Sequence, residues 1–388
     1  MTEYDIATPP TGPTGSGPEP TGPAGDRPGP LAEHRPRRRW PWVLFIVLAV
    51  AVATASRIDL NEYAISPGTA QSVQQFITVP ADKAHPVTHP VLLTDVEIAR
   101  VSALDYLFFR LQRNTVFDSV ESITGGTPPS ETDAQGALEM SQAEASAKTA
   151  ALRRLGYTVT ATAAGAVVDG VYAGTPAFPV IGVGDVISAV DGTPTLTADA
   201  LTAKLHTYHA GQTITLTVTA MGTTTPKPVV VTLTPTRVDV GGGQYETLTL
   251  GIQVEDQVDY TYPFPVSIDV TNIGGPSAGL AMTLGVMDAL TNGSLTGGRT
   301  VAATGTIDAQ GDVGDVGGVP QKTVAVENAG ASLFLVPPQE YQAARSKQRS
   351  GLQIYPVSTL NQALAVLAQH GGKVPPAPSG VGAGATTS

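Results

Sequence analysis

The sequence of 388 residues contains no cysteine, which excludes disulfide bonds, a thiol nucleophile and any metal site built on thiolates. Charge of either sign is sparse at 14%, against 41% hydrophobic residues, so the chain can bury the cores of two or three domains. The formal net charge of −11 would repel the phosphates of nucleic acids. We therefore expect no nucleic-acid partner.

Histidine is missing where the most informative motifs lie. All six histidines fall outside residues 244–369: His34, His85, His89, His206, His209 and His370. That segment nevertheless contains Ser277, in the run Asn-Ile-Gly-Gly-Pro-Ser-Ala-Gly-Leu at 272–280. If Ser277 is a nucleophile, its base is not a histidine of this segment.

Ser277 lies where a Gly-Gly-Pro turn meets an apolar run, residues 278–290, which predicts a buried helix. Unpaired backbone N–H groups and the positive end of the helix dipole gather at a helix N-terminus. Both stabilise the oxyanion that forms when a carbonyl is attacked. Gly274, Gly275 and Pro276 form the candidate oxyanion and substrate loop, because glycines leave room for a substrate backbone.

Lys322 is the candidate base. It follows Ser277 by 45 residues and is the only lysine between Lys227 and Lys347. A lysine accepts a proton only when it is uncharged, so burial has to lower its pKa from about 10.4 toward neutrality. The residues that follow Lys322 predict a helix that ends at Gly330.

Four separated motifs resemble the proteolytic domain of Lon-type serine proteases in content, order and spacing. They are Gly-Pro-Ser-Ala-Gly at 275–279, Ala-Thr-Gly-Thr-Ile at 303–307, Gly-Asp-Val at 311–313, and Val-Gly-Gly-Val-Pro-Gln-Lys at 316–322 with Ala-Gly-Ala at 329–331. The resemblance covers residues 244–370 and implies a proteolytic domain of the α+β class. Carried over residue by residue, it implies that Ser277 is the nucleophile and Lys322 the general base.

Two positions depart from the pattern of ATP-dependent Lon proteins. Gly275 stands where those proteins commonly carry aspartate, and Val319-Pro320-Gln321 replaces the usual Leu-Lys/Arg-Glu before the lysine. The changes flank Ser277 and Lys322 without removing either residue. We expect them to alter substrate preference more than the chemistry.

A small-molecule kinase is the minor alternative, because kinases distantly related in fold to Lon domains carry a similar Gly/Ser loop. A P-loop requires glycine directly before the lysine and again five residues earlier, but Gln321 and Val316 occupy those positions. No Walker A motif occurs anywhere in the 388 residues. The sequence therefore predicts an activity independent of ATP, and we expect no cofactor.

The N-terminal residues 1–39 are rich in proline, glycine and threonine and predict a disordered cytoplasmic tail that ends in the basic cluster 35–39. Residues 40–56 are uncharged, and about 17 to 25 such residues span a bilayer. With Trp40 and Trp42 at the interface, they predict a transmembrane anchor in contact with lipid.

A cleaved signal peptide is the competing interpretation of this segment, with Ala53-Thr54-Ala55 as the cleavage site. A leader of almost forty residues before the apolar run is long for a signal peptide, so we favour the retained anchor. Both interpretations place the rest of the chain outside the cytoplasm.

Residues 57–156, a membrane-proximal α/β region, carry no motif. Alternating residues predict strands at 73–79 and 91–101, and helical patterns predict helices at 102–113 and 138–155. His85 and His89 could share a helix face as metal ligands, but Pro86 and Pro90 favour a loop. We expect no metal site.

Residues 157–240 resemble a PDZ domain of the kind attached to bacterial envelope proteases. Gly-Thr-Pro-Ala at 174–177, Gly-Asp-Val-Ile at 184–187 and Asp-Gly at 191–192 occur in the expected order, before a helix near 198–206 and two alternating strands. Such a domain binds a peptide along the strand beside its helix, but the sequence leaves the binding residues unknown. His206 and His209 are interpreted as surface or groove residues.

The order of anchor, PDZ domain and Lon-type domain resembles a family of membrane-anchored bacterial PDZ proteases. The resemblance implies an ATP-independent serine endopeptidase on the outer face of a bacterial cytoplasmic membrane, with a single pass and a cytoplasmic N-terminus. Its expected substrates are extended or poorly folded proteins, including membrane-tethered ones. A catalytically silent PDZ adaptor is the main alternative, because a serine after Gly-Pro commonly caps a helix and a lysine is commonly a solvated charge. Residues 371–388 predict a disordered tail, and oligomerisation is not determined by the sequence.

Overall fold

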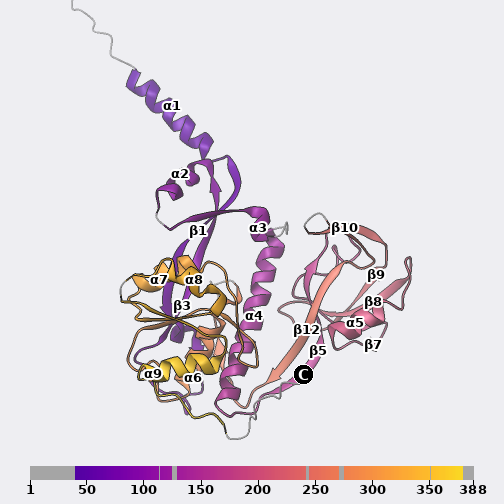
Figure 1. Ribbon diagram of the computed structural model, residues 1–388. Coiled ribbons are helices and arrows are strands. Elements are labelled where there is room, and N and C mark those ends of the chain that lie inside the picture. The colour runs from indigo at the N-terminus through magenta and orange to yellow at the C-terminus, as the bar shows by residue number, and fades with distance from the viewer. Residues whose placement is uncertain are drawn as a thin grey trace, which may run out of the picture. The chain divides into compact units, whose positions relative to one another are not determined.

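The computed structural model describes residues 40–112, 114–124, 129–241, 244–270, 275–349 and 351–378 (Figure 1). The chain divides into two compact units, residues 1–51 and residues 52–388. The first unit contains most of helix α1, and the second contains two hydrophobic sheets with their helices. The predicted tail at 1–39 lies outside the described residues.

Helix α1 (Trp40–Ala55) forms over the apolar segment that the sequence singles out, and none of its residues is buried. At 1.5 Å per residue its 16 residues extend about 24 Å, against about 30 Å for the hydrocarbon core of a bilayer. Among the described residues, no helix combines the length and the apolar character that a membrane crossing requires. The predicted transmembrane span over residues 40–56 is therefore not supported by the structure.

The larger sheet has six strands in the order β18-β17-β14-β3-β1-β4. Their bounds are β1 (Asp59–Ser72), β3 (Val91–Ser102), β4 (Val116–Ser119), β14 (Val301–Ala303), β17 (Leu333–Val336) and β18 (Gln353–Pro356). The strands from β3 to β18 run parallel, whereas β1 pairs antiparallel with β3 and β4. The central strands β14 and β17 are short, fully buried apolar runs, as expected where helices cover both faces of a sheet.

Alternate residues of β14 and β17 face two different helix layers. Leu333 and Leu335 belong to one cluster of buried residues with α4 (Pro129–Arg154), α6 (Gly279–Ala289) and α9 (Leu360–Gln369). Phe334 and Val336 belong to another with α7 (Val319–Asn328) and α8 (Tyr341–Arg345). The period of two along a strand thus produces the three layers in Figure 1, with α7 and α8 on one side and α6 and α9 on the other.

Residues 57–156 do not form a region of their own. Their strands β1 and β3 complete the sheet of the proteolytic segment, and their helix α4 packs against α6. Gly285 of α6 allows the close approach of this region, since a Cβ there would lie 2.5 Å from Cγ1 of Val73. The sequence could not show this join, because strand pairing over 200 residues leaves no local signal.

Two local predictions in this region need correction. The strand predicted at 73–79 is a 3-10 turn, η1 (Val73–Phe76), followed by the short strand β2 (Ile77–Thr78). The side chain of Ser72 caps η1 by accepting a hydrogen bond from the Gln74 N–H at 3.2 Å, which stops β1. The predicted helices correspond to α2 (Ala103–Leu111) and α4, which begins nine residues earlier than expected. Helix α3 (Val120–Thr124) and strand β13 (Ser267–Ile268), which pairs with β2, complete this part.

The second sheet has the strand order β12-β5-β6-β8-β9, and β7 (Thr193–Pro194) pairs with β6. Its strands are β5 (Thr160–Val171), β6 (Val186–Val190), β8 (Thr213–Thr219), β9 (Lys227–Thr232) and β12 (Ile252–Thr261), with helix α5 (Ala198–Leu205). A hairpin of β10 (Thr236–Gly241) and β11 (Gln244–Leu248) precedes β12. Strand β12 lies in the segment that the sequence assigned to the proteolytic domain, yet it pairs with β5 along its whole length.

Part of the predicted disordered tail, residues 371–378, is packed against the second unit. Arg154 donates hydrogen bonds to the carbonyl oxygens of Pro375 and Pro376 at 3.2 and 3.3 Å, and the Lys373 N–H donates to Ser294 at 3.1 Å. Val374 also packs against the main apolar cluster, so both polar and apolar contacts order this segment. Residues 379–388 lie outside the described part of the chain.

Candidate active site

Ser277 lies in the 3-10 turn η2 (Pro276–Ala278), directly before α6. Every residue of α6 is buried, while Ser277 itself is half-buried and reaches the surface. The caps of η2 and α6 are Gly275 and Ala278, neither of which makes a side-chain capping bond. Ser277 therefore does not serve as the N-cap of either helix, which removes the simplest structural explanation for a serine at this position.

Gly275 and Pro276 of the candidate oxyanion loop precede Ser277, whereas Gly274 lies outside the described residues. Gly275 has φ 85° and ψ 155°, a conformation that essentially only glycine adopts. A residue with a side chain would be strained in this conformation, so the backbone of the turn before Ser277 favours the glycine found at position 275.

The carbonyl oxygen of Ser277 is held by two donors from the Ala-Thr-Gly motif. The Gly305 N–H donates to it at 2.9 Å, and the Thr304 hydroxyl donates at 3.2 Å. The Leu280 N–H returns a hydrogen bond to the Gly305 carbonyl at 3.1 Å. These bonds fix the serine turn against the end of β14, two motifs that stand 27 residues apart in the sequence.

Lys322 lies in the first turn of α7, and 2% of its surface is exposed. The N-cap of α7, Gly318, has φ 70°, and a Cβ there would lie 2.7 Å from Cγ1 of Val96 on β3. The Lys322 N–H donates to the Gly318 carbonyl at 2.9 Å, so both residues share the face of α7 that packs on β3. The Gly-Gly motif therefore places the lysine side chain in the interior rather than in solvent.

Burial lowers the pKa of Lys322 to about 8, and the carboxylates of Asp95 and Glu340 oppose that shift. About one lysine in ten is then neutral at pH 7, compared with about one in a thousand for a free side chain. The amine Nζ donates a hydrogen bond to Oγ1 of Thr304 at 3.3 Å. Lys322 thus has a buried amine with a lowered pKa, and its role as a base stays a prediction.

Thr304 connects the two residues that the sequence singles out. Its hydroxyl accepts from Lys322 Nζ and donates to the Ser277 carbonyl, and its side chain is fully buried. Among the described residues, the hydrogen bond between Ser277 Oγ and Lys322 Nζ that a working pair requires is not formed. The structure therefore joins the Ser277 turn to Lys322 through Thr304, and the two side chains form no direct hydrogen bond with each other.

Sequence reasoning missed two residues of this site. Thr304 belongs to the Ala-Thr-Gly-Thr-Ile motif at 303–307. The place of this motif between the motifs of Ser277 and Lys322 was the sequence signal that could have identified it. Asp95 comes from β3, in the region without motifs, and no sequence signal pointed to it. Its carboxylate accepts a hydrogen bond from the Thr69 N–H at 2.5 Å, at an irregularity of β1.

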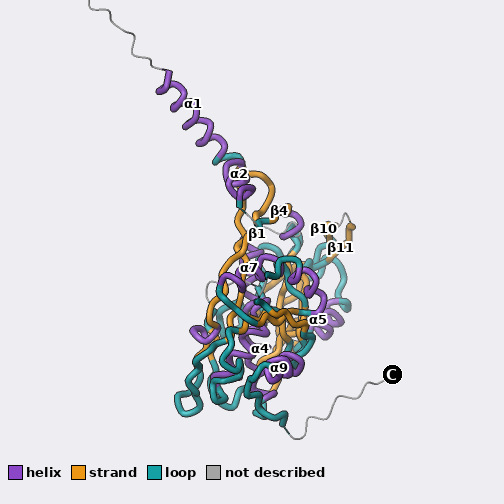
Figure 2. The backbone as a smooth tube through the Cα atoms, turned by 60° about the vertical axis from the view of Figure 1, so that its left-hand side comes forward, coloured by secondary structure: helices purple, strands orange, loops and turns teal. Residues whose placement is uncertain are grey.

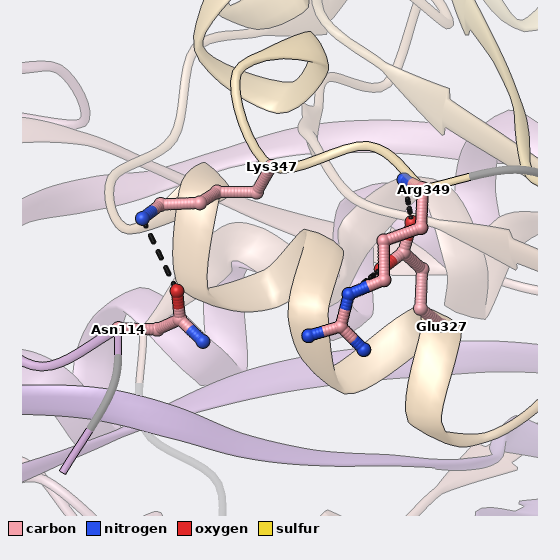
Figure 3. Close-up of polar contacts among 4 residues, drawn as sticks. All are labelled: Asn114, Glu327, Lys347 and Arg349. Atoms are coloured by element: carbon pink, nitrogen blue, oxygen red, sulfur yellow. Dashed lines mark hydrogen bonds and ion pairs between the residues drawn. The ribbon is translucent and has the colours of Figure 1, made fainter.

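A cavity of about 350 Å³ lies at the far end of α7 and contains neither Ser277 nor Lys322. Beside it, Arg349 forms an ion pair with Glu327 at 3.5 Å and also donates its N–H to the same carboxylate (Figure 3). Lys347 donates to Oδ1 of Asn114 at 3.1 Å, which connects residues 57–156 to the C-terminal part of the sheet. These contacts are structural and add nothing to the site of Ser277.

In the second sheet, helix α5 packs beside the edge strand β12. Strand β12 is the edge strand next to this helix, and Ile252 and Val254 pack half-buried in the same apolar cluster as Leu201 of α5. Asp256 of β12 accepts a hydrogen bond from the Ala198 N–H at the start of α5, at 2.7 Å. His206 and His209 are exposed at the end of α5, as expected.

Two known domain families match this chain, and each match covers a different segment. Residues 266–370 match the model described as the Lon protease (S16) C-terminal proteolytic domain. The chain contains a Lon-type proteolytic domain. Residues 153–225 match the PDZ domain model. The two resemblances seen in the sequence are thereby confirmed at the level of the domain families.

Two curated Lon proteases are similar to about a quarter of the chain. Lon protease 2 of Bacillus subtilis is 39% identical over 92 residues, which are 24% of this chain and 16% of that protein. The Lon protease of Chloroflexus aggregans is 33% identical over 94 residues, or 24% and 11% of the two chains. The chain therefore spans at most about a sixth of the length of these relatives. Among solved structures, a PDZ domain from Listeria monocytogenes covers 24% of this chain and 90% of its own, at 24% identity and a TM-score of 0.20.

Proposed function

We propose that this protein is a serine endopeptidase in which Ser277 is the nucleophile and Lys322 the general base. The observation that carries the proposal is the buried Lys322 amine, whose pKa burial lowers to about 8 and which Thr304 joins to the Ser277 turn. The match of residues 266–370 to Lon proteolytic domains supports it independently. It also favours a protease over the kinase alternative.

In the first step, neutral Lys322 takes the proton of Ser277 Oγ while that oxygen attacks the peptide carbonyl carbon. A neutral amine has one lone pair and two protons, so Nζ can accept from Ser277 while it still donates to Thr304. A rotation of the Ser277 side chain supplies the missing contact, and the carbonyl anchored by Thr304 and Gly305 keeps the backbone in place meanwhile.

The tetrahedral oxyanion then needs donors at the N-terminal end of η2 and α6, where Gly275 leaves the approach open, since a Cβ there would meet nothing within 4 Å. Collapse of the intermediate breaks the C–N bond, and protonated Lys322 returns its proton to the leaving amine. Water attacks the resulting acyl-serine, with Lys322 again as the base. None of these steps consumes ATP, so we propose cleavage of extended or poorly folded chains.

Casein cleavage by the purified full chain tests this proposal. We expect the wild type to cleave casein equally with and without ATP, and Ser277→Ala to abolish cleavage. Ser277 caps no helix, so the variant should unfold within about 1 kcal/mol of the wild type. A folded Ser277→Ala protein that cleaves at the wild-type rate would disprove the assignment, and two proteins that are both inactive would favour the silent adaptor.

We further propose that the PDZ domain binds a substrate peptide along the edge of β12 that does not pair with β5, beside helix α5. A peptide there would add a strand to the sheet and cover Ile252 and Val254. Hydrogen exchange in the Ser277→Ala protein tests this without cleavage. A bound peptide should slow exchange of amides within 252–261, and unchanged exchange at saturating peptide would refute this binding site.

Finally, we propose that residues 40–56 attach the chain to the bacterial cytoplasmic membrane, with the PDZ and proteolytic domains on its outer side. The support is that the apolar side chains of α1 are exposed to solvent, at 57 to 63% for Val43 to Leu48. Membrane fractionation and digestion of intact spheroplasts by an added protease test both parts. A soluble mature chain that begins at Ser56 would establish the signal-peptide alternative.

A further inference from the structure

Helix α2 carries an apolar stripe that faces solvent. Leu104, Leu107, Phe108 and Leu111 recur at i, i+3, i+4 and i+7, the spacing with which a helix normally faces a protein core. Here Leu107 is 65% exposed, Phe108 61% and Leu111 86%. No residue of α2 is buried. A contiguous apolar stripe of this size on a soluble surface indicates an interaction site.

The helix is well anchored despite this exposure. The ring of Tyr106 contacts that of Phe117 on β4 with centroids 4.6 Å apart, and α2 lies beside β1 and β4 (Figure 2). Ser102 and Asp105 form a capping box, in which each side chain accepts from the other residue's backbone N–H, at 3.0 and 3.2 Å. Helix α2 is therefore held in place, and the exposure of its apolar stripe does not result from fraying of the helix.

We infer that the stripe of α2 inserts into the interfacial region of a lipid bilayer, as a second membrane contact beside α1. The inference rests on the proposed membrane attachment through residues 40–56. It adds that the sheet on which the helix of Lys322, α7, packs is itself held at the bilayer surface, because α2 follows β3 directly.

The start of α2 lies close to the last residues of α1, which belong to the same compact unit. The Ala103 N–H, at the start of α2, donates to the Ile58 carbonyl at 2.9 Å. Ile58 is three residues beyond Ala55, the last residue of α1. Three residues extend at most about 10 Å, so the start of α2 lies within about that distance of the end of α1. Ile58 is itself 50% exposed.

Residue type favours lipid over a second protein. Helix α2 is neutral overall, with Asp105 in its first turn and Arg110 in its last, and its exposed residues are large and apolar. The Arg110 guanidinium lies 5.4 Å from the centre of the Tyr106 ring. Aromatic rings beside arginine on an amphipathic helix are the composition that binds at the headgroup level of anionic membranes.

The absence of cysteine makes the test direct, because one introduced cysteine carries a spin label at one site. We would label Leu107→Cys in the full chain bound to vesicles of phosphatidylethanolamine and phosphatidylglycerol. For each spin label, the rate of collision with oxygen, which is enriched in lipid, is compared with the rate of collision with a water-soluble nickel complex. Leu48→Cys in α1, 62% exposed, marks the proposed attachment, and Val230→Cys in β9, 63% exposed, is the control.

We expect the labels at positions 107 and 48 to collide several times more with oxygen than with nickel, and the label at position 230 to show the reverse. If the label at position 107 collides more with nickel than with oxygen, as expected at position 230, the inference is overturned. If position 48 is then still in lipid, the proposed attachment survives; if it is in water, both fail. Spin–spin broadening at position 107 that disappears on dilution with unlabelled protein would instead assign the stripe to a second copy of the chain and overturn the inference.

Discussion

Residues 266–370 and residues 57–156 contribute to one sheet but differ in how much their sequences reveal. The first segment carries the motifs, matches a known domain family, and supplies Ser277, Thr304 and Lys322. The second carries no motif, yet its β3 lies between β14 and β1. The comparison teaches that the segment recognisable as a family domain is smaller than the unit that folds.

The two segments also contribute differently to the site. The first supplies the groups that we propose react, while the second supplies Val96 against Gly318 and the carboxylate of Asp95. We therefore expect substitutions in the first segment to remove activity. Substitutions at the join should lower stability, and Asp95 should only tune the pH dependence.

The largest effect is expected for Lys322→Arg. A guanidinium loses its proton only above about pH 12, so it cannot act as a base. Activity on casein or a fluorogenic peptide should fall to that of Lys322→Ala at every pH. In the wild type the rate should rise with pH through the pKa of about 8. More than about a tenth of wild-type activity in the arginine variant would show that Lys322 only positions Ser277.

Lys322→Met controls for folding in that experiment. The native pKa is lowered, so between about pH 8 and 10.5 the unfolded chain binds the proton that the native chain lacks, and wild-type stability rises with pH across that window. Below pH 8 the wild type bears the full cost of burying the charge. Lys322→Met should then be inactive but more stable by up to roughly 3 kcal/mol at pH 7.

Thr304→Val should reduce the rate by about ten- to a hundredfold. It removes the acceptor of Lys322 Nζ and one donor to Ser277, and a hydrogen bond to a charged group contributes about 1.5 to 3 kcal/mol. Thr304→Ser keeps the hydroxyl and should recover most of the rate. Equal rates for the valine and serine variants would show that the hydroxyl of Thr304 does not connect the two residues.

Gly285→Ala tests the join between the two segments. Its Cβ would lie 2.5 Å from Val73 and 2.7 Å from Ile77, so we expect a loss of about 1 to 3 kcal/mol in the free energy of unfolding, despite the better helix propensity of alanine. Gly136→Ala in α4 is the matched control, because its Cβ meets nothing within 4 Å, and it should be neutral or stabilising. Equal unfolding midpoints for both variants would contradict the packing of α6 on η1.

The smallest effect is expected for Asp95→Asn. The Asp95 carboxylate raises the pKa of Lys322 against the lowering by burial, so its loss should shift the rise of the rate to lower pH and increase the rate at pH 7. Asparagine retains an oxygen that can accept from the Thr69 N–H. Glu340→Gln should shift the profile in the same direction. A shift of the Asp95→Asn profile to higher pH would exclude this influence of β3 on the site.

Much of the site could be predicted from the sequence because its determinants are local. A Gly-Pro turn before an apolar run placed Ser277 ahead of α6, and a Gly-Gly pair placed Lys322 at the start of α7. Helix starts, glycine conformations and buried apolar runs depend on neighbours within a few residues. The class of the fold and the two domain families followed from the same local patterns.

Only the tertiary structure decided how these pieces combine. Strand β12 pairs with β5 across some 90 residues, and β3 pairs with β14 across some 200. Local sequence patterns do not reveal which strand edge another strand will pair with, because backbone hydrogen bonds are alike in every pairing. Tertiary packing thus brought Asp95 near Lys322 and Thr304 between Lys322 and Ser277. The sequence by itself contains the candidate groups Ser277 and Lys322, and long-range strand pairing and helix packing determine the buried surroundings that lower the pKa of Lys322.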